Sequence, residues 1–299
     1  MSRKKIAIAV VHGIGTYDYD LEGDSSALAF SSKLRQRIER SFPVRGRYPR
    51  QSHFRDEIAW REVRYAHIFQ DVQSDFLTAV EPAVKKSTAR ALVVQNIGDA
   101  AAYRPDRGDD PGEPRTYERV HKCMAATLKS LEEEVEPGAP LIILAHSLGG
   151  HVTSNYLWDM QRAGATLAGE PVSDFQRGKT LCSLITFGCN IPLFLFGLPR
   201  EKVRSLKFPG EHCPARYLDK AWWLNFYDRD DPLGYPLGDW GHDYEQMRRE
   251  GALEDHRVNV GNLFQRWNLL SHNGYWTGRD FYRAATSRIR RVMEAADGA

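Results

Sequence analysis

The sequence has no closely spaced pair of cysteines, no long apolar run and no large excess of one charge. Each of these absences excludes a class of protein. Its four cysteines show neither a Cys-x-x-Cys pair nor the spacing of a metal site, which predicts free thiols in a reducing compartment. No stretch reaches the ~18 uninterrupted apolar residues of a membrane-spanning helix. The net charge of +2 over 299 residues predicts no strong attraction to nucleic acid or to an anionic membrane. We therefore expect a globular protein with no metal, no nucleic-acid partner and no stable membrane anchor.

The chain starts with a basic segment followed by an apolar one, as a secretory signal peptide does. However, the apolar run 6–11 is too short for such a signal, and it continues into His-Gly-Ile-Gly without a cleavage site. The pattern therefore predicts a buried first strand, and the protein is expected in the cytoplasm.

Short apolar runs alternate with helical patterns along the rest of the chain. The runs that predict strands lie at 6–11, 58–65, 141–145, 181–187, 222–227 and 257–260. This alternation predicts a single α/β domain over residues 1–299, with a mainly parallel central sheet and helices on both faces. The loops 42–57, 104–115 and 190–220 are candidate lid or cap elements.

Several helix boundaries are also predicted. Ser25 or Ser26 is expected to cap a helix that runs past Ile38, and residues 69–96 are expected to be mostly helical with a break at Pro82. Residues 42–55 are expected to form an exposed loop. Thr277 and Asp280 are spaced as a capping box for the last helix, with Phe281, Ala285, Ile289 and Val292 facing inward.

Residues 141–151 predict a buried strand that turns sharply into a helix around a serine. They read Leu-Ile-Ile-Leu-Ala-His-Ser-Leu-Gly-Gly-His, and such a turn exposes the side chain of Ser147. A serine nucleophile needs a base within hydrogen-bonding distance, a group that orients this base, and donors for the oxyanion. In an open parallel sheet these groups gather at the carboxyl ends of the strands. We therefore expect the partners of Ser147 to follow other strands.

Residues 145–149, Ala-His-Ser-Leu-Gly, resemble the nucleophile elbow Gly-x-Ser-x-Gly of the α/β-hydrolase superfamily, with alanine in place of the first glycine. The sequence Ala-His-Ser-x-Gly-Gly is similar to a variant found in some bacterial lipases. The resemblance implies the α/β-hydrolase fold and a catalytic Ser147.

Residues 12–15, His-Gly-Ile-Gly, are similar to the His-Gly oxyanion loop of such lipases. The resemblance implies that the backbone N–H groups of Ile14 and Leu148 bind the oxyanion. His12, Gly13 and His146 would then support this loop and the elbow.

Asp231 is the predicted acid of the triad. It follows the predicted strand 222–227 in the segment Asp-Pro-Leu-Gly-Tyr-Pro, which is similar to the segment that carries the acid in many members of the superfamily. Asp228 is the alternative acid and Asp230 a further competitor. Three acids in four residues also fit a solvated turn or a weak cation site, although the other ligands of a calcium loop are missing.

His272 is the predicted base. It lies in Ser-His-Asn-Gly-Tyr-Trp, and similar Ser-His-x-x-Tyr-Trp segments carry the catalytic histidine in some hydrolases of the superfamily. His256 is the alternative, but we expect it to precede the last strand and so to lie at the wrong end of the sheet. The order Ser147, Asp231, His272 is that of the superfamily.

The resemblance implies a serine hydrolase that cleaves carboxylic esters through an acyl-enzyme, without a cofactor. A thioesterase, acyltransferase or amidase on the same three residues is the first alternative, and a binding protein that keeps the fold without turnover is the second. The substrate is expected to be a small-molecule ester or a lipid-derived one. The apolar run 191–199, with Leu193, Phe194 and Phe196, is a candidate acyl pocket or lid, although core packing fits it equally well.

Three further patterns are set aside. Gly-Asp-Ser at 23–25 imitates the motif of another class of serine esterase, but no buried strand precedes it. Gly-Lys-Thr at 178–180 lacks the earlier glycine and the strand of a phosphate loop. The arginines of residues 45–55 are expected on a solvated loop rather than on a nucleic-acid-binding surface.

Overall fold

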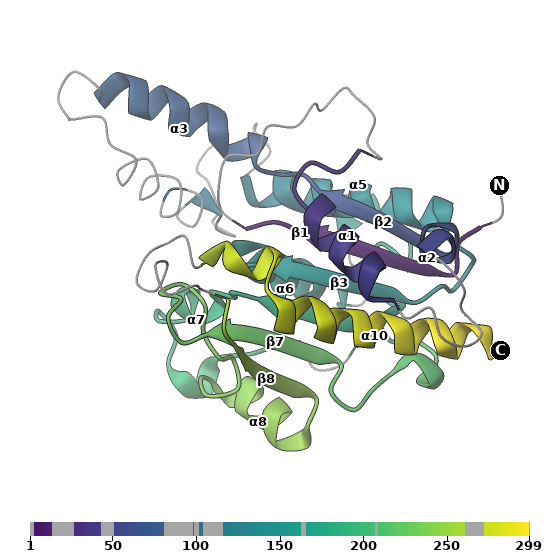
Figure 1. The fold of residues 1–299 in the computed structure, drawn as a ribbon. Coiled ribbons are helices and arrows are strands. Elements are labelled where there is room, and N and C mark those ends of the chain that lie inside the picture. Colours follow the sequence, from purple (N-terminus) through teal and green to yellow (C-terminus); the bar gives the residue numbers. More distant parts are fainter. Residues whose placement is uncertain are drawn as a thin grey trace.

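A computed structural model gives the fold, and it describes residues 3–13, 27–42, 51–80, 98, 102–103, 116–162, 166–206, 209–260 and 272–298. The central element is a six-stranded sheet in the order β2-β1-β3-β6-β7-β8, and every pair of neighbouring strands is parallel (Figure 1). The strands are β1 (Ile6–Val11), β2 (Ile58–Val63), β3 (Leu141–His146), β6 (Leu181–Phe187), β7 (Trp223–Asp228) and β8 (Leu253–Val258).

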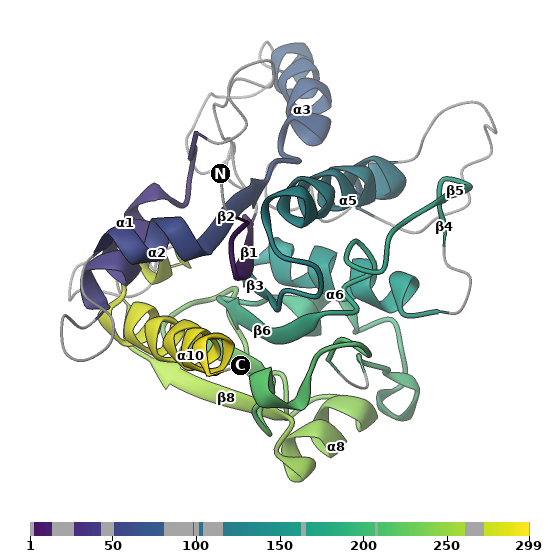
Figure 2. The ribbon, with the colours of Figure 1, turned by 90° about the vertical axis from the view of Figure 1, so that its right-hand side faces the viewer.

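Helices cover both faces of this sheet, as Figure 2 shows. One face packs against α1 (Ser32–Ser41), α2 (Gln51–Glu57) and α10 (Arg279–Asp297), and the other against α5 (Thr116–Glu134), α6 (Leu148–Met160) and α8 (His242–Glu250). Helix α3 (His67–Val80) packs on α5 and projects beyond the sheet, and among its described side chains only Ile68 and Phe69 at its start join the buried cluster. Alternate residues of a strand point to opposite faces, so Ile6 and Ile8 join one cluster of buried side chains and Ala7 and Ala9 the other. Burial on both faces explains why the inner strands are continuous apolar runs.

Shorter elements complete the described chain. They are the antiparallel pair β4 (Thr166–Leu167) and β5 (Glu170–Pro171), the one-turn helix α7 (Ile191–Phe194), and the 3₁₀ turns η1 (Arg200–Lys202), η2 (Ala215–Tyr217) and η3 (Gly274–Trp276). Within the described parts of the chain, no helix combines the length and the apolar character needed to cross a bilayer.

The first helix begins later than the sequence predicts. It starts at Ser32 with Ser31 as its N-cap, and Ser25 and Ser26 lie outside the described residues. The buried carboxylate of Glu62, on β2, accepts hydrogen bonds from the backbone N–H groups of Ala29 (2.7 Å), Phe30 (3.0 Å) and Ser31 (2.6 Å). This carboxylate holds residues 29–31 in a non-helical turn, so the helix starts after them.

The prediction of an exposed loop over residues 42–55 is wrong in its second half. Helix α2 begins at Gln51, and Phe54 is 2% exposed. Its ring contacts those of Phe42 and Trp60, so an aromatic cluster anchors this segment. Residues 43–50 lie outside the described chain, as does the candidate lid loop 104–115. The predicted helix 69–96 corresponds to α3 as far as Val80, and residues 81–97 are not described.

The last strand and the last helix both differ from prediction at their starts. Strand β8 covers Leu253–Val258 rather than 257–260, because polar residues dominate this edge strand and hide its pattern. The capping box at Thr277 and Asp280 is also wrong: Gly278 is the N-cap of α10, and no side chain caps it. Its predicted inward face, Phe281, Ala285, Ile289 and Val292, is buried as expected.

The candidate lid segment 190–220 contains α7, η1 and η2, joined by irregular chain. The first residues after β1, β3, β6 and β7 all lie at one edge of the sheet, because these strands run in the same direction. This edge holds His12, Ser147 and the acidic turn 228–231.

Candidate functional site

Ser147 lies at the turn between β3 and α6. Its backbone has φ 53° and ψ −125°, a region that residues with a side chain rarely adopt. Its N–H donates to the carbonyl of Phe187 at the end of β6 (3.1 Å), which ties the turn to the neighbouring strand. The geometry is that of a sharp elbow, but Ser147 is fully buried. The prediction that this turn exposes its side chain is therefore wrong, because the chain around the elbow covers it.

The loop after β1 packs directly against this elbow. A Cβ placed on Gly13 would lie 2.5 Å from the Cβ of Ser147, so this approach requires glycine. Ile14, the predicted oxyanion donor of this loop, lies outside the described residues. Leu148, the other predicted donor, is the first residue of α6 and directly follows Ser147.

His12 is a fully buried part of this loop. Its Nδ1–H donates to the carbonyl of Gly13 (2.6 Å), and its Nε2 accepts from the backbone N–H of Tyr65 (3.4 Å). Burial lowers the pKa of His12 to about 3, so the ring is neutral. Tyr65 stacks on the ring at 4.1 Å and donates its hydroxyl to the His12 carbonyl (2.7 Å). These contacts fix the backbone of the loop beside Ser147.

Asp231 and His272 form a buried, hydrogen-bonded pair at this edge. The Nδ1–H of His272 donates to both carboxylate oxygens of Asp231, at 2.9 and 3.0 Å. The N–H of Leu233 (2.9 Å) and the hydroxyl of Tyr275 (2.9 Å) donate to the same carboxylate. Burial by itself raises the pKa of Asp231, but the hydrogen bonds and the charge of His272 outweigh it and lower the pKa below its ordinary value.

Asp228 makes contacts of a different kind. Its carboxylate accepts from the backbone N–H groups of Asp230 (3.0 Å) and Val260 (2.6 Å). These contacts link the turn after β7 to the segment after β8. Asp228 therefore stabilises the turn that carries Asp231.

His256 lies within β8 rather than before the last strand. Its ring stacks on Phe226 at 5.0 Å, and its Nε2 lies 3.2 Å from the carboxylate of Glu254. The expectation that it precedes the strand is therefore wrong, because the strand begins three residues before it. These contacts are structural ones along an edge strand.

His146, the last residue of β3, connects the elbow to the segment that carries His272. Its Nε2 lies 2.8 Å from the backbone carbonyl of His272 and must donate, because a carbonyl only accepts. Burial and the neighbouring His272 lower the pKa of His146 to about 3, so it is neutral. The contact ties the backbone of His272 to the carboxyl end of β3.

Three buried atoms at this edge have no hydrogen-bond partner among the described residues, namely Ser147 Oγ, His146 Nδ1 and His272 Nε2. Buried polar atoms are usually paired, and a catalytic role is one explanation for an exception. Ser147, Asp231 and His272 all belong to the same edge of the sheet.

The candidate acyl-pocket residues lie on and after α7. Leu193 and Phe194 belong to this helix, and the ring of Phe194 stacks on His151 of α6 at 4.1 Å. Phe196 is 69% exposed, and Leu198 is 47% exposed. This segment is thus anchored on α6 at one end and presents apolar side chains to solvent at the other.

Two residues of this edge were not predicted from the sequence. Tyr65 follows β2 and holds the His12 loop, and Tyr275 follows His272 and holds Asp231. The signal for Tyr65 is its place after a strand of the parallel sheet. The signal for Tyr275 is its place three residues after His272 in the Ser-His-x-x-Tyr-Trp segment.

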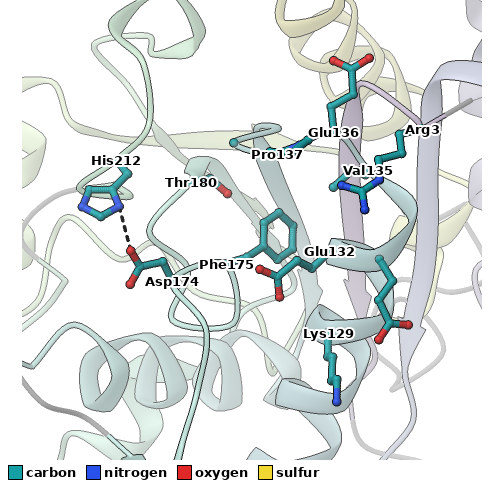
Figure 3. A pocket seen from close by; sticks show the side chains of 12 residues that line it. Arg3, Lys129, Glu132, Val135, Glu136, Pro137, Asp174, Phe175, Thr180 and His212 are labelled. Atoms are coloured by element: carbon teal, nitrogen blue, oxygen red, sulfur yellow. Dashed lines mark ion pairs between the residues drawn. The ribbon is translucent and has the colours of Figure 1, made fainter.

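A cavity of about 540 Å³ lies at the opposite edge of the sheet. Among its lining residues, Arg3 precedes β1, Gly138 precedes β3 and Thr180 precedes β6. Figure 3 shows Asp174 paired with His212 on its rim, at 3.2 Å. This cavity is therefore separated from Ser147 by the length of the strands.

The comparisons with known proteins agree with this architecture. Residues 10–295 match the alpha/beta hydrolase family. The chain therefore belongs to the alpha/beta hydrolase family, and the α/β-hydrolase fold predicted from the sequence is confirmed. The coarse class of the protein is that of a hydrolase.

Several solved structures are similar to the chain at low identity. A protein provisionally assigned as a carboxylesterase, from Lactobacillus plantarum WCFS1, is 12% identical, with a TM-score of 0.43 over 99% of this chain and 87% of that one. A truncated carbohydrate esterase from gut microbiota is 10% identical, with a TM-score of 0.34 over 60% and 69%. A provisionally assigned hydrolase of the α/β superfamily, from Xanthomonas campestris pv. campestris, is 11% identical, with a TM-score of 0.31 over 94% and 98%. No curated protein matches the chain by sequence.

Proposed function

We propose that this protein is a serine hydrolase that cleaves carboxylic esters, with Ser147 as nucleophile, His272 as base and Asp231 as acid. The observation that carries the proposal is the buried hydrogen bond from His272 Nδ1–H to Asp231, at 2.9 Å, at the same edge of the sheet as a serine in a strained elbow. A protein without turnover has no physical need for a buried imidazole–carboxylate pair at the same edge of the sheet as a strained serine.

The hydrogen bond to Asp231 fixes the proton of neutral His272 on Nδ1. Nε2 is then the basic atom, and it accepts the Ser147 proton as Oγ attacks the ester carbonyl. The lowered pKa of Asp231 keeps its carboxylate ionised, so it stabilises the imidazolium that forms. The imidazolium next protonates the leaving alcohol, and water activated by His272 releases the acyl group from Ser147.

The oxyanion of the tetrahedral intermediate needs donors beside Ser147. Leu148 begins a 13-residue helix, so its N–H is one of the unsatisfied donors at the helix N-terminus and carries the positive end of the helix dipole. We propose it as one donor and Ile14 as the second, on the family resemblance of the His12–Gly13 loop. The contact of Gly13 with Ser147 brings that loop within reach.

The exposed apolar side chains after α7 support a substrate class. The exposed Phe196 and Leu198 lie after α7, which packs on the helix of the elbow through Phe194 and His151. We propose that this segment contacts an apolar acyl chain, so the substrate is a small-molecule or lipid-derived ester. Parallel assays with nitrophenyl esters of increasing chain length, an acyl thioester and an anilide distinguish esterase from thioesterase and amidase activity.

A fluorophosphonate probe tests the proposal directly. We expect wild-type protein to be labelled on Ser147 and to hydrolyse nitrophenyl esters. Ser147→Ala and His272→Ala should both lose labelling and should lower kcat by up to roughly 10⁶-fold, because the two residues act as one unit.

Ser154→Ala is the matched control, since Ser154 is a buried serine of the same helix. It should keep both labelling and turnover. Wild-type protein with neither label nor ester turnover would instead indicate a binding protein. A label on Ser25 would indicate the Gly-Asp-Ser class of esterase.

A further inference from the structure

Tyr275 lies three residues after His272, in the turn η3, and is fully buried. Its hydroxyl lies 2.8 Å from the backbone nitrogen of Asp228 and 2.9 Å from Oδ2 of Asp231. The N–H of Asp228 can only donate, so the hydroxyl accepts from it. The single proton of the hydroxyl is therefore directed at Asp231.

His272 and Tyr275 act on Asp231 from the same turn of the chain. Residues three apart on a helical turn point to one side, and here both donate to a single carboxylate. The N–H groups of Trp276 and Thr277 donate to the carbonyls of Asn273 and Gly274, which makes the turn one hydrogen-bonded unit. A displacement of Asp231 away from this unit therefore breaks two hydrogen bonds to its carboxylate, one from His272 and one from Tyr275.

Tyr275 also fixes the acid-bearing turn at two points. One point is the backbone of Asp228, where β7 ends, and the other is the carboxylate itself. Close packing leaves little freedom between them, because a Cβ on Gly234 would lie 2.4 Å from Asp231 Oδ2 and 2.9 Å from the Tyr275 hydroxyl. Burial raises the pKa of Tyr275, so the hydroxyl keeps its proton throughout an activity assay.

A hydrogen bond to a carboxylate does more than hold it in place. The donor takes up part of the negative charge, which weakens the attraction that the carboxylate exerts on another cation. Three donors share the charge of Asp231, namely His272, Tyr275 and the N–H of Leu233. Of these, only Tyr275 can be removed without changing the backbone or the base.

We propose that Tyr275 is a positioning residue, which fixes the Asp231 carboxylate and withdraws part of its charge from His272, and so sets the pH range in which the base is active. The proposal rests on the proposed function, in which His272 is the base. It predicts that loss of the hydroxyl allows the His272–Asp231 pair to take up a proton at higher pH.

Other ionisable groups face this pair and must stay constant in the test. His146 approaches from β3, and burial lowers its pKa to about 3, so it stays neutral above that pH. Asp228 approaches from the end of β7, and its carboxylate keeps its own donors, the N–H groups of Asp230 and Val260, when Tyr275 is changed. A Tyr275 variant without the hydroxyl loses two contacts, with the Asp231 carboxylate and with the N–H of Asp228. Only the first involves a group that titrates, so a change in the pH profile is attributable to it.

The test is the pH profile of kcat/KM for a nitrophenyl ester with Tyr275→Phe. We expect kcat/KM to fall roughly tenfold, mainly through kcat, since one hydrogen bond to a charged group is lost. The acidic limb should move to higher pH by about half a unit. Tyr235→Phe is the matched control, because its hydroxyl donates only to the carbonyl of Pro232 in the same turn (2.7 Å), and it should leave the acidic limb in place.

Replacement of Tyr275 by 3-fluorotyrosine gives the opposite sign. The fluorinated phenol is a stronger donor of nearly the same size, so the acidic limb should move to lower pH. This second variant decides the question if Tyr275→Phe does not fold. A purely structural role for the tyrosine would move neither limb.

An unmoved acidic limb in folded Tyr275→Phe, or in the fluorotyrosine protein, would overturn the role of Tyr275 while the labelling of Ser147 still supports the hydrolase. Wild-type protein that is not labelled on Ser147 would overturn the proposed function and this inference with it. The two failures therefore give different results in the same set of samples.

Discussion

At the scale of single residues, Asp228 and Asp231 have the same side chain and different contacts. Asp231 accepts from His272 Nδ1–H, whereas Asp228 accepts from two backbone N–H groups. We predict that Asp231→Asn lowers ester turnover by roughly 10³- to 10⁴-fold, because the amide no longer selects the Nδ1–H tautomer or stabilises the imidazolium. Steady-state kinetics with a nitrophenyl ester measures the loss.

Asp228→Asn is the matched comparison for this prediction. An asparagine oxygen still accepts one hydrogen bond from Asp230 or Val260, so we expect most of the activity to remain. A larger loss in Asp228→Asn than in Asp231→Asn would assign the acid to Asp228 instead.

At the scale of secondary-structure elements, the start of α1 depends on β2. Glu62 of β2 is 6% exposed and accepts hydrogen bonds from the backbone N–H groups of three consecutive residues before the helix. We predict that Glu62→Gln lowers the free energy of unfolding by about 2 kcal/mol, because the amide keeps only one acceptor oxygen and its hydrogen bonds are no longer to a charged group. Urea unfolding followed by circular dichroism measures the change.

Glu57→Gln serves as the control at this scale. Glu57 pairs with Lys5 at 3.3 Å near the surface, and exposed ion pairs of this kind contribute about 0–1 kcal/mol. Equal losses in both variants would contradict the role assigned to Glu62.

At the scale of the whole molecule, four histidines make stability depend on pH. Burial lowers the pKa of His12, His121 and His146 to about 3, and that of His151 to about 4, from an ordinary value of 6.5. The unfolded chain binds protons at these sites below pH 6.5 and the folded one does not, so protonation favours unfolding. We predict that these histidines do not change the free energy of unfolding above pH 6.5. Below that pH they should lower it progressively as the pH falls toward 3.

Each fully buried histidine contributes a slope of up to about 1.4 kcal/mol per pH unit in that window. Urea unfolding at several pH values measures it. His121 lies on α5 and is bonded to the Tyr103 hydroxyl (2.8 Å), and His121→Gln should lower stability overall but reduce the slope. An unchanged slope in His121→Gln would contradict the prediction.

The sequence alone determined the inner strands and the fold class. Strands buried on both faces must be apolar throughout, so β1, β3 and β6 are visible as short runs without reference to their partners. The position of Ser147 is also local information, because the elbow needs small residues directly around it. Asp231 and His272 as catalytic partners stay predictions until the kinetics are measured.

Features that depend on contacts between distant segments could be seen only in the tertiary structure. Strand β8 lies at the edge of the sheet with four polar residues in its centre, so its start at Leu253 has no apolar signature. The first helix begins directly after the residues whose backbone N–H groups donate to Glu62, and this carboxylate is about thirty residues away in sequence. Tyr275 donates to Asp231 from a segment 44 residues further along. Such hydrogen bonds depend on which side chains the fold brings together, and no local pattern of hydrophobicity or spacing encodes them.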